Sequence, residues 1–292
     1  MAAAFGYTVS DEDARATLLH GVSKGVTLID TAPAYGNGVA ERRVGALLRE
    51  VPRKDLILSS KAGWIPDASG GGVRSYARDA IRRSVEASLA RLGADYLDIV
   101  HVHDPDLGDF YQQVLDEAFP ALHDLKSQGV IRAVSAGMNQ WQMLREFALH
   151  ADVDCFLLAG RYTLLEQDPL EQFFPLMLKK KIPIFLGGIF NSGILATGAV
   201  AGARYNYEIA PDAILRKTRQ IEAICARYEV PLRAAALQFV ASHPAVASVI
   251  VGMSKPAEVD DNLTMLDIPI PSAFWQELRL ENLIDLGAPT PS

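Results

Sequence analysis

Short apolar runs alternate with longer segments of helical periodicity along most of the chain. The apolar runs are rich in Val, Ile and Leu, and they predict buried strands at 26–30, 56–61, 97–103, 131–136, 154–158, 182–187 and 247–252. The intervening segments repeat their apolar residues with the helical period, and they predict helices that include 77–92, 111–128 and 212–228. Gly93 and Gly129 stand where the first two of these helices are expected to end.

This alternation indicates a parallel α/β fold. Each helix supplies the crossover that two neighbouring parallel strands require. About seven such units follow one another without a linker, a repeat or a low-complexity segment. We therefore predict that residues 1–292 form a single (β/α)8 TIM barrel rather than a doubly wound sheet.

The predicted barrel lacks a clear first strand. The first helical segment, "SDEDARATLLHGVSKG", begins at an expected cap, Ser10, with Asp13 three residues later. Residues 1–7 are too few and too rich in Ala to form a convincing strand before it. Either the N-terminus is shortened, or the segment 193–210 forms an irregular strand and the count changes.

Composition excludes several classes of function. The formal net charge of -7 and the pI near 5.4 argue against a nucleic-acid partner, because such proteins concentrate Lys and Arg to displace counterions. No apolar run approaches the roughly 18 residues of a membrane span, and the start of the chain lacks a basic region before an apolar stretch. We predict a soluble, cytoplasmic protein without a membrane partner.

The two cysteines argue against a metal or disulfide framework. Cys155 and Cys225 lie far apart and outside any Cys-x-x-Cys spacing. We predict two core thiols and no metal.

Polar residues follow several predicted strands, where a barrel collects its catalytic groups. These residues are Asp30, Tyr35, Lys61, His103 and Asn139. An ammonium about 4 Å from a phenol stabilises the phenolate by roughly 4 kcal/mol at an effective dielectric of about 20, which equals up to about 3 pKa units. We expect Lys61 to lower the pKa of Tyr35, Asp30 to balance Lys61, and His103 to orient a substrate oxygen. Such a set suits carbonyl reduction or alcohol oxidation.

Four motifs resemble the signatures of the aldo-keto reductases, in order and at the family's spacing. They are "IDTAPAYGNGVAERRVG", "LSSKAGW", "DYLDIVHVHDPD" and "VIVGMSKPAEVDDN", and the similarity runs from about Ser10 to Asp267. The resemblance implies the barrel fold and a catalytic tetrad of Asp30, Tyr35, Lys61 and His103. The family's opening Gly-rich strand is missing, which independently supports a shortened N-terminus.

A narrower resemblance concerns the substrate. "VHVHD" and "GMNQW" resemble the branch that contains L-galactose dehydrogenase, L-fucose (D-threo-aldose) 1-dehydrogenase and pyridoxal 4-dehydrogenase. This implies hydride transfer from the anomeric carbon of an aldose to NAD(P), which gives a lactone. The alternatives are an NADPH-dependent reductase of small aldehydes or ketones and a non-catalytic, cofactor-binding regulator. The sequence leaves the sugar or aldehyde open, and it leaves open whether the chain is a monomer or a homodimer.

The tetrad requires a hydride carrier, because none of its side chains accepts a hydride. In the family this carrier is a nicotinamide dinucleotide. The resemblance assigns Asn139 to the carboxamide. It assigns Ser192, Gly193 and Leu195 to the pyrophosphate, Gly252, Ser254 and Lys255 to the adenosine end, and Glu258 and Asn262 to adenine and its ribose.

Glu258 favours NAD over NADP. Many NADP-dependent relatives carry an arginine at the matching position, where it binds the 2'-phosphate. A carboxylate repels that phosphate and accepts hydrogen bonds from a free 2'-hydroxyl. Lys255 is the residue that could still bind a 2'-phosphate.

Four further residues are candidates for the sugar pocket: Trp64, Asp104, Trp141 and Tyr205. Packing at the rim of the barrel is an equal alternative for the two tryptophans. His101 shares a strand face with His103, but we expect it to be a buried histidine bonded to a neighbouring loop. Two other patterns have structural explanations: "GNGVAE" lacks the third glycine of a dinucleotide loop, and the lysines of "LKKKIP" complement a helix dipole on a solvated face.

Overall fold

The computed structural model describes residues 9–67 and 71–291, which group into two compact units. The first unit contains the residues up to Met138, together with 143–156 and 252–259. The second unit contains 139–142, 157–251 and the residues from 260 onward. The segment 1–7, on which the missing first strand depends, lies outside the described residues. The single-domain organisation stays a prediction.

Four parallel strands form the sheet of the first unit. In spatial order they are β1 (Leu28–Asp30), β2 (Ile57–Ala62), β5 (Leu97–His103) and β6 (Ile131–Met138). The register places Asp30 beside Ser59, Lys61 beside His101, and His103 beside Gly137. Because the strands are parallel, their carboxyl ends bring the predicted polar residues to one edge of this sheet.

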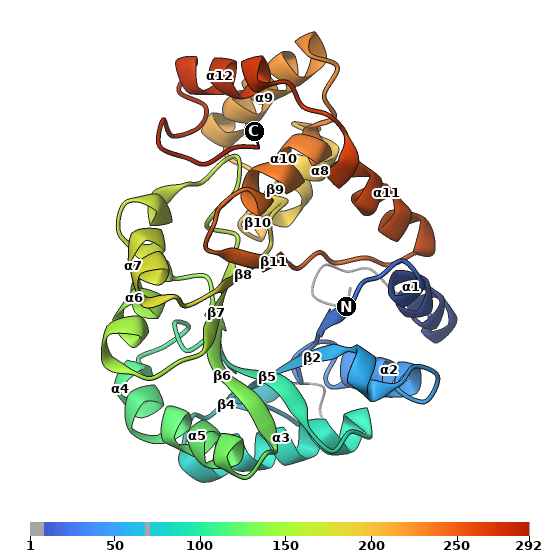
Figure 1. Cartoon of the computed structure of the whole chain (residues 1–292), viewed down its shortest axis with the longest axis vertical. Helices are drawn as coiled ribbons and strands as arrows, with labels where there is room; N and C mark the ends of the chain where they lie inside the picture. The colour runs from blue at the N-terminus through green and yellow to red at the C-terminus, as the bar shows by residue number, and fades with distance from the viewer. Residues whose placement is uncertain (1–8, 68–70, 292) are drawn as a thin grey trace. The chain divides into compact units, whose positions relative to one another are not determined.

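Helices cover one face of these strands (Figure 1). They are α1 (Asp11–Ser23), α2 (Val39–Leu47), α3 (Arg78–Leu92) and α5 (Phe119–Ser127). Ser10 caps α1 as predicted, since its side chain accepts a hydrogen bond of 3.0 Å from the backbone N–H of Asp13. Every residue of β5 is buried, including its polar ones, which is the pattern of a strand covered on both faces.

The predicted helix at 111–128 is interrupted. It consists of α4 (Tyr111–Gln113), a π-helical turn at Val114–Ala118, and α5. Pro120 explains the interruption, because it has no N–H to donate to the carbonyl four residues earlier and its ring crowds that carbonyl. The other elements of this part of the chain are η2 (Arg53–Asp55), the hairpin β3 (Trp64–Pro66) and β4 (Gly72–Arg74), α6 (Trp141–His150) and α11 (Pro256–Asp267).

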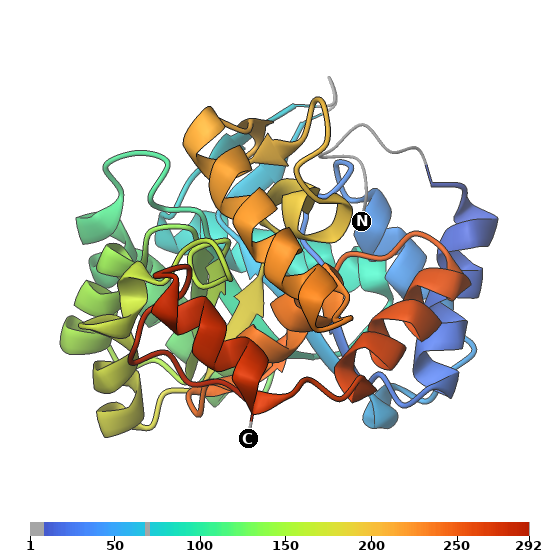
Figure 2. The ribbon, with the colours of Figure 1, turned by 90° about the horizontal axis from the view of Figure 1, so that it is seen from above.

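The second unit continues the alternation of strand and helix. Its strands are the last residues of β7 (Cys155–Ala159), then β8 (Ile184–Gly187) and β11 (Val246–Val249), and β8 pairs with β11 in parallel. Short helices follow the strands at η4 (Asp168–Leu170), α7 (Phe173–Lys180), η5 (Asn191–Gly193) and α8 (Ile194–Thr197). Three longer helices, α9 (Asp212–Arg227), α10 (Leu232–Ala241) and α12 (Ser272–Leu280), run beside one another in orange and red (Figure 2).

All seven predicted strands are present, with bounds shifted by no more than three residues. The alternative of an irregular parallel strand in 193–210 is wrong. That segment contains α8 and the hairpin of β9 (Arg204–Tyr205) with β10 (Glu208–Ile209), which pair with each other in antiparallel fashion. The left-handed residues Asn206 and Tyr207 form the turn of this hairpin.

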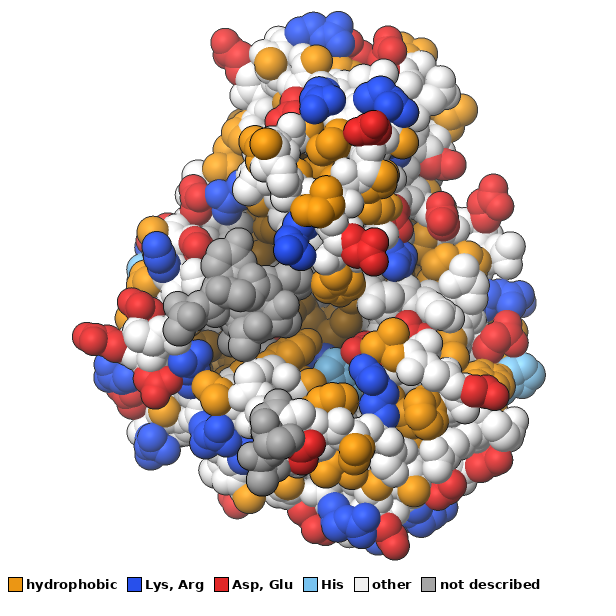
Figure 3. Space-filling model, turned by 180° about the vertical axis from the view of Figure 1, so that it is seen from behind, with side chains coloured by type: hydrophobic (Ala, Val, Ile, Leu, Met, Phe, Trp, Pro, Cys, Tyr) orange, Lys and Arg blue, Asp and Glu red, His pale blue; other side chains and the backbone are white. Residues whose placement is uncertain are grey.

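The surface has charges of both signs. On the face in Figure 3, side chains of Lys and Arg are interspersed with those of Asp and Glu. Among residues 9–67 and 71–291, no helix is long and apolar enough to cross a membrane. Cys155 and Cys225 are both free and buried, as predicted.

Candidate active site

The four residues of the predicted tetrad meet in the first unit. Asp30 ends β1, Lys61 lies in β2, His103 ends β5, and Tyr35 stands in the loop after β1. Lys61 Nζ donates to Asp30 Oδ2 at 2.6 Å and to the carbonyl oxygen of Thr31 at 2.9 Å. The same Nζ lies 4.7 Å from the centre of the Tyr35 ring, and that ring meets His103 edge to face at 5.9 Å.

A tight turn holds Tyr35 in place. Gly36, Asn37 and Gly38 have successive φ values of 61°, 52° and 82°, in the left-handed region that glycine tolerates best. The N–H of Gly38 donates to the carbonyl of Pro33 at 2.8 Å and closes the turn before α2. A Cβ at Gly38 would lie 2.8 Å from Cδ of Arg91, so the close approach also requires glycine. "GNG" is therefore a structural turn.

Burial and charge compete at the ion pair. The side chain of Lys61 is only 2% exposed and that of Asp30 only 6%. Burial acts to lower the pKa of Lys61, but the neighbouring charge of Asp30 and the Tyr35 phenol outweigh it, so the pKa is raised. Lys61 thus stays an ammonium beside the phenol.

The pKa of Tyr35 is raised although Lys61 opposes the rise. Lys61 acts to lower the pKa, as expected, but burial of the phenol is the larger effect and raises the pKa above its usual value. The negative charges of Asp30 and Asp104 add to this rise. The expected effect of Lys61 is therefore present but outweighed by desolvation of the phenolate.

His103 is neutral. Burial lowers its pKa well below 6.5, and the charge of Lys61 lowers it further. The hydroxyl of Tyr76 donates to the carbonyl of His103 at 2.6 Å and fixes the end of β5. A neutral imidazole can donate one hydrogen bond to a substrate oxygen.

Asp104 follows His103 in a left-handed backbone conformation, with φ 48°. Its Oδ2 lies 3.5 Å from His103 Nε2. Burial and the nearby charge of Asp106 raise the pKa of Asp104 to about 6. A carboxyl group therefore stands beside the imidazole, and its contact to a sugar stays a prediction.

The other sugar-pocket candidates have different surroundings. Trp64 lies in the first unit, where the guanidinium of Arg74 sits 5.3 Å from the centre of its ring. Tyr205 lies in the second unit, and its hydroxyl donates to Glu166 Oε1. Its hydroxyl is thus already engaged within the protein. The roles of these residues stay predictions.

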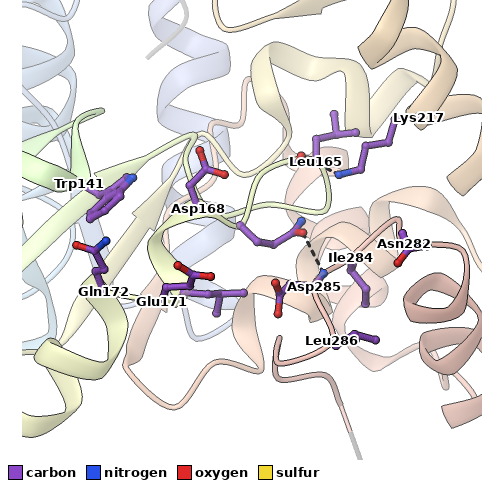
Figure 4. Close-up of a pocket in the computed structure, with 12 residues that line it drawn as sticks. Trp141, Leu165, Asp168, Glu171, Gln172, Lys217, Asn282, Ile284, Asp285 and Leu286 are labelled. Atoms are coloured by element: carbon purple, nitrogen blue, oxygen red, sulfur yellow. Dashed lines mark hydrogen bonds between the residues drawn. The ribbon is translucent and has the colours of Figure 1, made fainter.

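Trp141 lines a pocket of about 710 Å³ in the second unit (Figure 4). Asp168, Glu171 and Asp285 contribute carboxylates to its wall, and Lys217 an ammonium. Lys217 Nζ donates to the carbonyl of Leu165 at 3.0 Å, and burial lowers its pKa. The pocket is polar and has the size of a small-molecule site.

Three predicted cofactor residues, Ser192, Gly193 and Leu195, lie at the start of α8. Ser192 and Gly193, together with Asn191 before them, adopt successive left-handed conformations with φ values of 59°, 104° and, for Asn191, 44°. A Cβ added at Gly193 would meet no atom within 4 Å, so the backbone there borders open space. Ser192 Oγ accepts from the N–H of Tyr207 at 2.8 Å, whereas Leu195 is buried in α8. The side chain of Leu195 is therefore part of the core.

The remaining cofactor candidates lie near α11, or next to β6 in the case of Asn139. Glu258 Oε2 accepts from the backbone N–H of Ser254 at 2.6 Å, and its carboxylate also accepts from Ser254 Oγ at 3.1 Å. The site of Gly252 is open, since a Cβ there would meet no atom within 4 Å. In the second unit, Asn262 Oδ1 accepts from Arg233 at 2.8 Å, and Asn139 Nδ2 donates to the carbonyl of Ala159 at 2.7 Å.

Each unit by itself has features that suit a dinucleotide. Gly252 and the tetrad in the first unit, and Gly193 in the second, supply backbone that borders open space and acid–base groups without a hydride acceptor. Lys255 is part of the same turn, since its carbonyl accepts from the N–H of Glu258 at 3.0 Å. The assignment of each residue to a part of the cofactor stays a prediction. No group of His, Cys, Asp and Glu suited to a metal ion occurs in the described ranges.

Sequence reasoning missed a set of buried polar residues behind the tetrad. Ser59 Oγ donates to Asp30 Oδ1 at 2.7 Å and lies 2.9 Å from His101 Nε2. His101 Nδ1 lies 2.7 Å from Ser135 Oγ. The predicted loop partner of His101 is therefore wrong, because its partners are serines of the neighbouring strands. The signal was present, since Ser59 precedes Lys61 by two residues and so shares its face.

The sequence matches the Aldo/keto reductase family over residues 2–280. The chain belongs to the aldo-keto reductase family. It is 35% identical over 308 residues to pyridoxal 4-dehydrogenase of Microbacterium luteolum, with 94% of this chain and 90% of that protein covered. It is also 35% identical over 303 residues to D-threo-aldose 1-dehydrogenase of a Pseudomonas species, with 97% and 91% covered.

Solved structures agree on the fold. An aldo-keto reductase of Bacillus halodurans in its holo form has a TM-score of 0.78 at 24% identity, with 96% of this chain and 90% of that chain covered. This aldo-keto reductase therefore has the family's α/β fold of the TIM-barrel type. It is an oxidoreductase of the aldo-keto reductase type, in a family that uses nicotinamide cofactors.

Proposed function

We propose that this aldo-keto reductase is an NAD-dependent aldose 1-dehydrogenase. The observation that carries the proposal is the Lys61–Asp30 pair beside Tyr35, with a neutral His103 at the edge of the same phenol. Similarity to a D-threo-aldose 1-dehydrogenase, at 35% identity, supports the substrate class. Asp104 supports it as well, because a carboxylate beside the imidazole can accept hydrogen bonds from sugar hydroxyls.

The tetrad accepts the proton that the substrate loses in the reaction. The anomeric hydroxyl of a ring-form aldose would sit between the Tyr35 oxygen and His103. Tyr35, as phenolate, accepts the hydroxyl proton, while the neutral imidazole of His103 donates a hydrogen bond to the substrate oxygen. NAD, when bound, supplies the hydride acceptor. The aldose loses a proton and a hydride, and a lactone is formed.

The direction of the Tyr35 pKa shift sets the pH dependence. Because the pKa is raised, only a small fraction of the phenol is ionised near neutral pH. Oxidation needs the phenolate, so its rate rises with pH. Reduction needs the protonated phenol, so its rate falls as pH rises through the same pKa.

A reductase of small aldehydes is the second candidate function. The raised pKa of Tyr35 favours it, since the phenol is a ready proton donor at neutral pH. The NADH-specific methylglyoxal reductase of Escherichia coli, 29% identical over 276 residues, is a relative whose name describes such a reaction. That name also supports the NAD preference inferred from Glu258.

Formation of reduced nicotinamide, followed by absorbance, tests the proposal. Purified protein with NAD or NADP is offered L-galactose, L-fucose, D-arabinose and pyridoxal at alkaline pH. Turnover of one aldose with NAD is expected. Turnover of pyridoxal alone would show that the substrate is pyridoxal and not an aldose. Reduction of small aldehydes without any oxidation would establish the reductase as the function. Tight cofactor binding without turnover in either direction would revive a regulatory role.

Glu258→Arg tests the cofactor preference. The guanidinium would pair with a 2'-phosphate, so kcat/KM should shift toward NADP by about 10-fold or more. Glu258→Gln is the control, because it removes the charge without adding a cation. A wild-type protein that already prefers NADP would overturn the assignment.

A further inference from the structure

A chain of buried hydrogen bonds leads away from the tetrad and joins residues of five strands, β1, β2, β5, β6 and β7. It begins at Asp30 Oδ1, which accepts from Ser59 Oγ at 2.7 Å. Ser59 Oγ lies 2.9 Å from His101 Nε2, and His101 Nδ1 lies 2.7 Å from Ser135 Oγ. Ser135 Oγ also donates to the carbonyl of Cys155 at 2.8 Å. All five residues belong to the first unit.

The chemistry of its members gives the chain a direction. Asp30 pairs with the ammonium of Lys61, so its carboxylate accepts and the single hydrogen of Ser59 points to Asp30. His101 Nε2 must then carry a hydrogen and donate it to Ser59. Burial lowers the pKa of His101 well below 6.5, and the charge of Lys61 lowers it further. His101 is therefore a neutral imidazole of the Nε2–H tautomer.

At the far end of this chain of hydrogen bonds, every donor has an acceptor. With Nε2 protonated, Nδ1 of His101 is an acceptor for Ser135. The one hydrogen of Ser135 has three acceptors within reach: this nitrogen, the carbonyl of Cys155 at 2.8 Å and the carbonyl of Ala136 at 3.4 Å. Ser59 and His101 are each 1% exposed and Ser135 is fully buried, so water cannot replace a lost partner. Removing a buried member leaves another unsatisfied, which is costly.

We propose that His101 is a positioning residue for the Asp30–Lys61–Tyr35 group. Through Ser59 it holds Asp30 so that Oδ2 stays on Lys61 Nζ, at 2.6 Å, while Oδ1 is occupied. Lys61 is thereby kept under the Tyr35 ring, 4.7 Å from its centre. The inference rests on the proposed function insofar as Tyr35 is its acid–base group.

Breaking the chain changes the ionisation of Tyr35. In Ser59→Ala, Asp30 Oδ1 loses its donor, and in His101→Leu the Ser59 hydroxyl loses the donor that keeps its hydrogen on Asp30. In both variants the carboxylate draws the Lys61 ammonium more strongly to itself. The phenolate loses part of its stabilisation, so the pKa of Tyr35 rises further. The ionisable groups that face Tyr35 are Lys61, Asp30, His103 and Asp104. Those that face His101 are Lys61, Asp30 and His103.

The first test is the pH profile of kcat for His101→Leu, His101→Gln and Ser59→Ala. The Leu and Ala variants should shift the alkaline limb of the oxidation upward by about 1 pH unit, with about 10-fold lower kcat below it. His101→Gln should move back toward wild type, because an amide offers both a donor and an acceptor. The KM for NAD should change by less than about 2-fold, since none of these residues is assigned to the cofactor.

Ser84→Ala is the matched control. Ser84 is buried in α3, and its hydroxyl has no hydrogen-bond partner among the described residues. Ser84→Ala removes one buried hydroxyl, as Ser59→Ala does, but it breaks no chain of hydrogen bonds. The pH profile should therefore be that of wild type. A profile shifted equally in Ser84→Ala would mean that the effect is one of general stability, and it would overturn the proposal.

A second test does not depend on turnover. In protein labelled with carbon-13 at the ring carbon that bears the hydroxyl of tyrosine, the Tyr35 signal is assigned with Tyr35→Phe and titrated by NMR. The titration should move to higher pH in His101→Leu and in Ser59→Ala. Nitrogen-15 spectra should show His101 as the neutral Nε2–H tautomer. An inactive wild type would refute the proposed function and leave this test intact.

Two results would overturn the inference. One is a folded His101→Leu or Ser59→Ala protein whose Tyr35 titrates as in wild type. The other is a His101 that is the Nδ1–H tautomer, because it could not then donate to Ser59. If His101→Leu fails to fold, Ser59→Ala carries the test, since it removes one small hydroxyl.

Discussion

Two tyrosines, one in each unit, face opposite charges. Tyr35 lies over the ammonium of Lys61, whereas the hydroxyl of Tyr205 donates to the carboxylate of Glu166. Burial raises the pKa of both phenols. At Tyr35 the cation opposes that rise, while at Tyr205 the hydrogen bond and the charge of Glu166 add to it. The first phenol can therefore exchange a proton, and the second is held as a donor.

The surroundings of Glu166 explain this difference. Its Oε1 also accepts from Arg161 at 3.2 Å, from Asn206 at 3.2 Å and from Asn191 at 3.4 Å. The carboxylate thus ties together the loop after β7, the start of α8 and the β9–β10 hairpin. We interpret this cluster as a structural tie within the second unit, in contrast to the proton-transfer group of the first.

Tyr35→Phe should give the largest effect. The phenyl ring keeps the packing against Lys61 and His103 but removes the proton acceptor. We expect kcat to fall by about 10²- to 10⁴-fold, as measured by steady-state kinetics at alkaline pH. Tyr111→Phe, a tyrosine of α4 outside the tetrad, is the control. A Tyr35→Phe enzyme with the wild-type rate would contradict the assigned role.

Lys61→Met should give the second-largest effect. Without the ammonium, the pKa of Tyr35 should rise by up to about 3 units, so kcat should fall by about 10²-fold at a pH below that pKa. The pH profile of kcat checks this, and the exposed Lys54→Met is its control. A large loss without any change in the profile would show that Lys61 acts through folding alone, by leaving Asp30 unpaired in a buried place.

Glu166→Gln should mainly lower stability. The amide cannot accept all four hydrogen bonds, so the free energy of unfolding should fall by about 1–3 kcal/mol, as measured by urea denaturation. The kcat should stay within about 2-fold of wild type. Glu208→Gln, on the exposed strand β10, is the control. A loss of kcat without a loss of stability would show that the Glu166 cluster takes part in the reaction.

Tyr205→Phe should have the smallest effect. It removes one hydrogen bond to Glu166, which contributes about 1 kcal/mol or somewhat more, since the acceptor is charged. If Tyr205 contacts the sugar as the sequence predicted, the KM for the aldose should instead rise by about 10-fold. Parallel measurements of unfolding and of KM separate the two roles.

The sequence predicted most of the architecture because its signals are local. Apolar runs of strand length and helical periodicity placed all seven strands and the main helices, and Ser10 was identified as a cap from its spacing to Asp13. The helix expected at 111–128 is present, but its π-helical turn at Val114–Ala118 was missed, although Pro120 was a visible cause. Parallel strand order also predicted that Asp30, Lys61 and His103 would lie at one edge.

The partners of individual groups were less predictable. His101 was expected to bond to a loop, but it bonds to Ser59 and Ser135 from neighbouring strands. Which residues stand beside each other depends on the register of β2, β5 and β6, and no short segment of the chain contains that information. The same reason applies to Glu166, which gathers donors from three separate segments.

By itself, the sequence determined the family and the α/β elements, and it identified the four candidate residues of the tetrad, because these are properties of residue types and spacing. Only the tertiary structure decided the direction of the Tyr35 pKa shift and the partners of His101. The reason is that desolvation and hydrogen bonding depend on what surrounds a group in space. The Lys61 charge was readable in advance, but the burial that outweighs it at Tyr35 arises only when the strands and the loop come together.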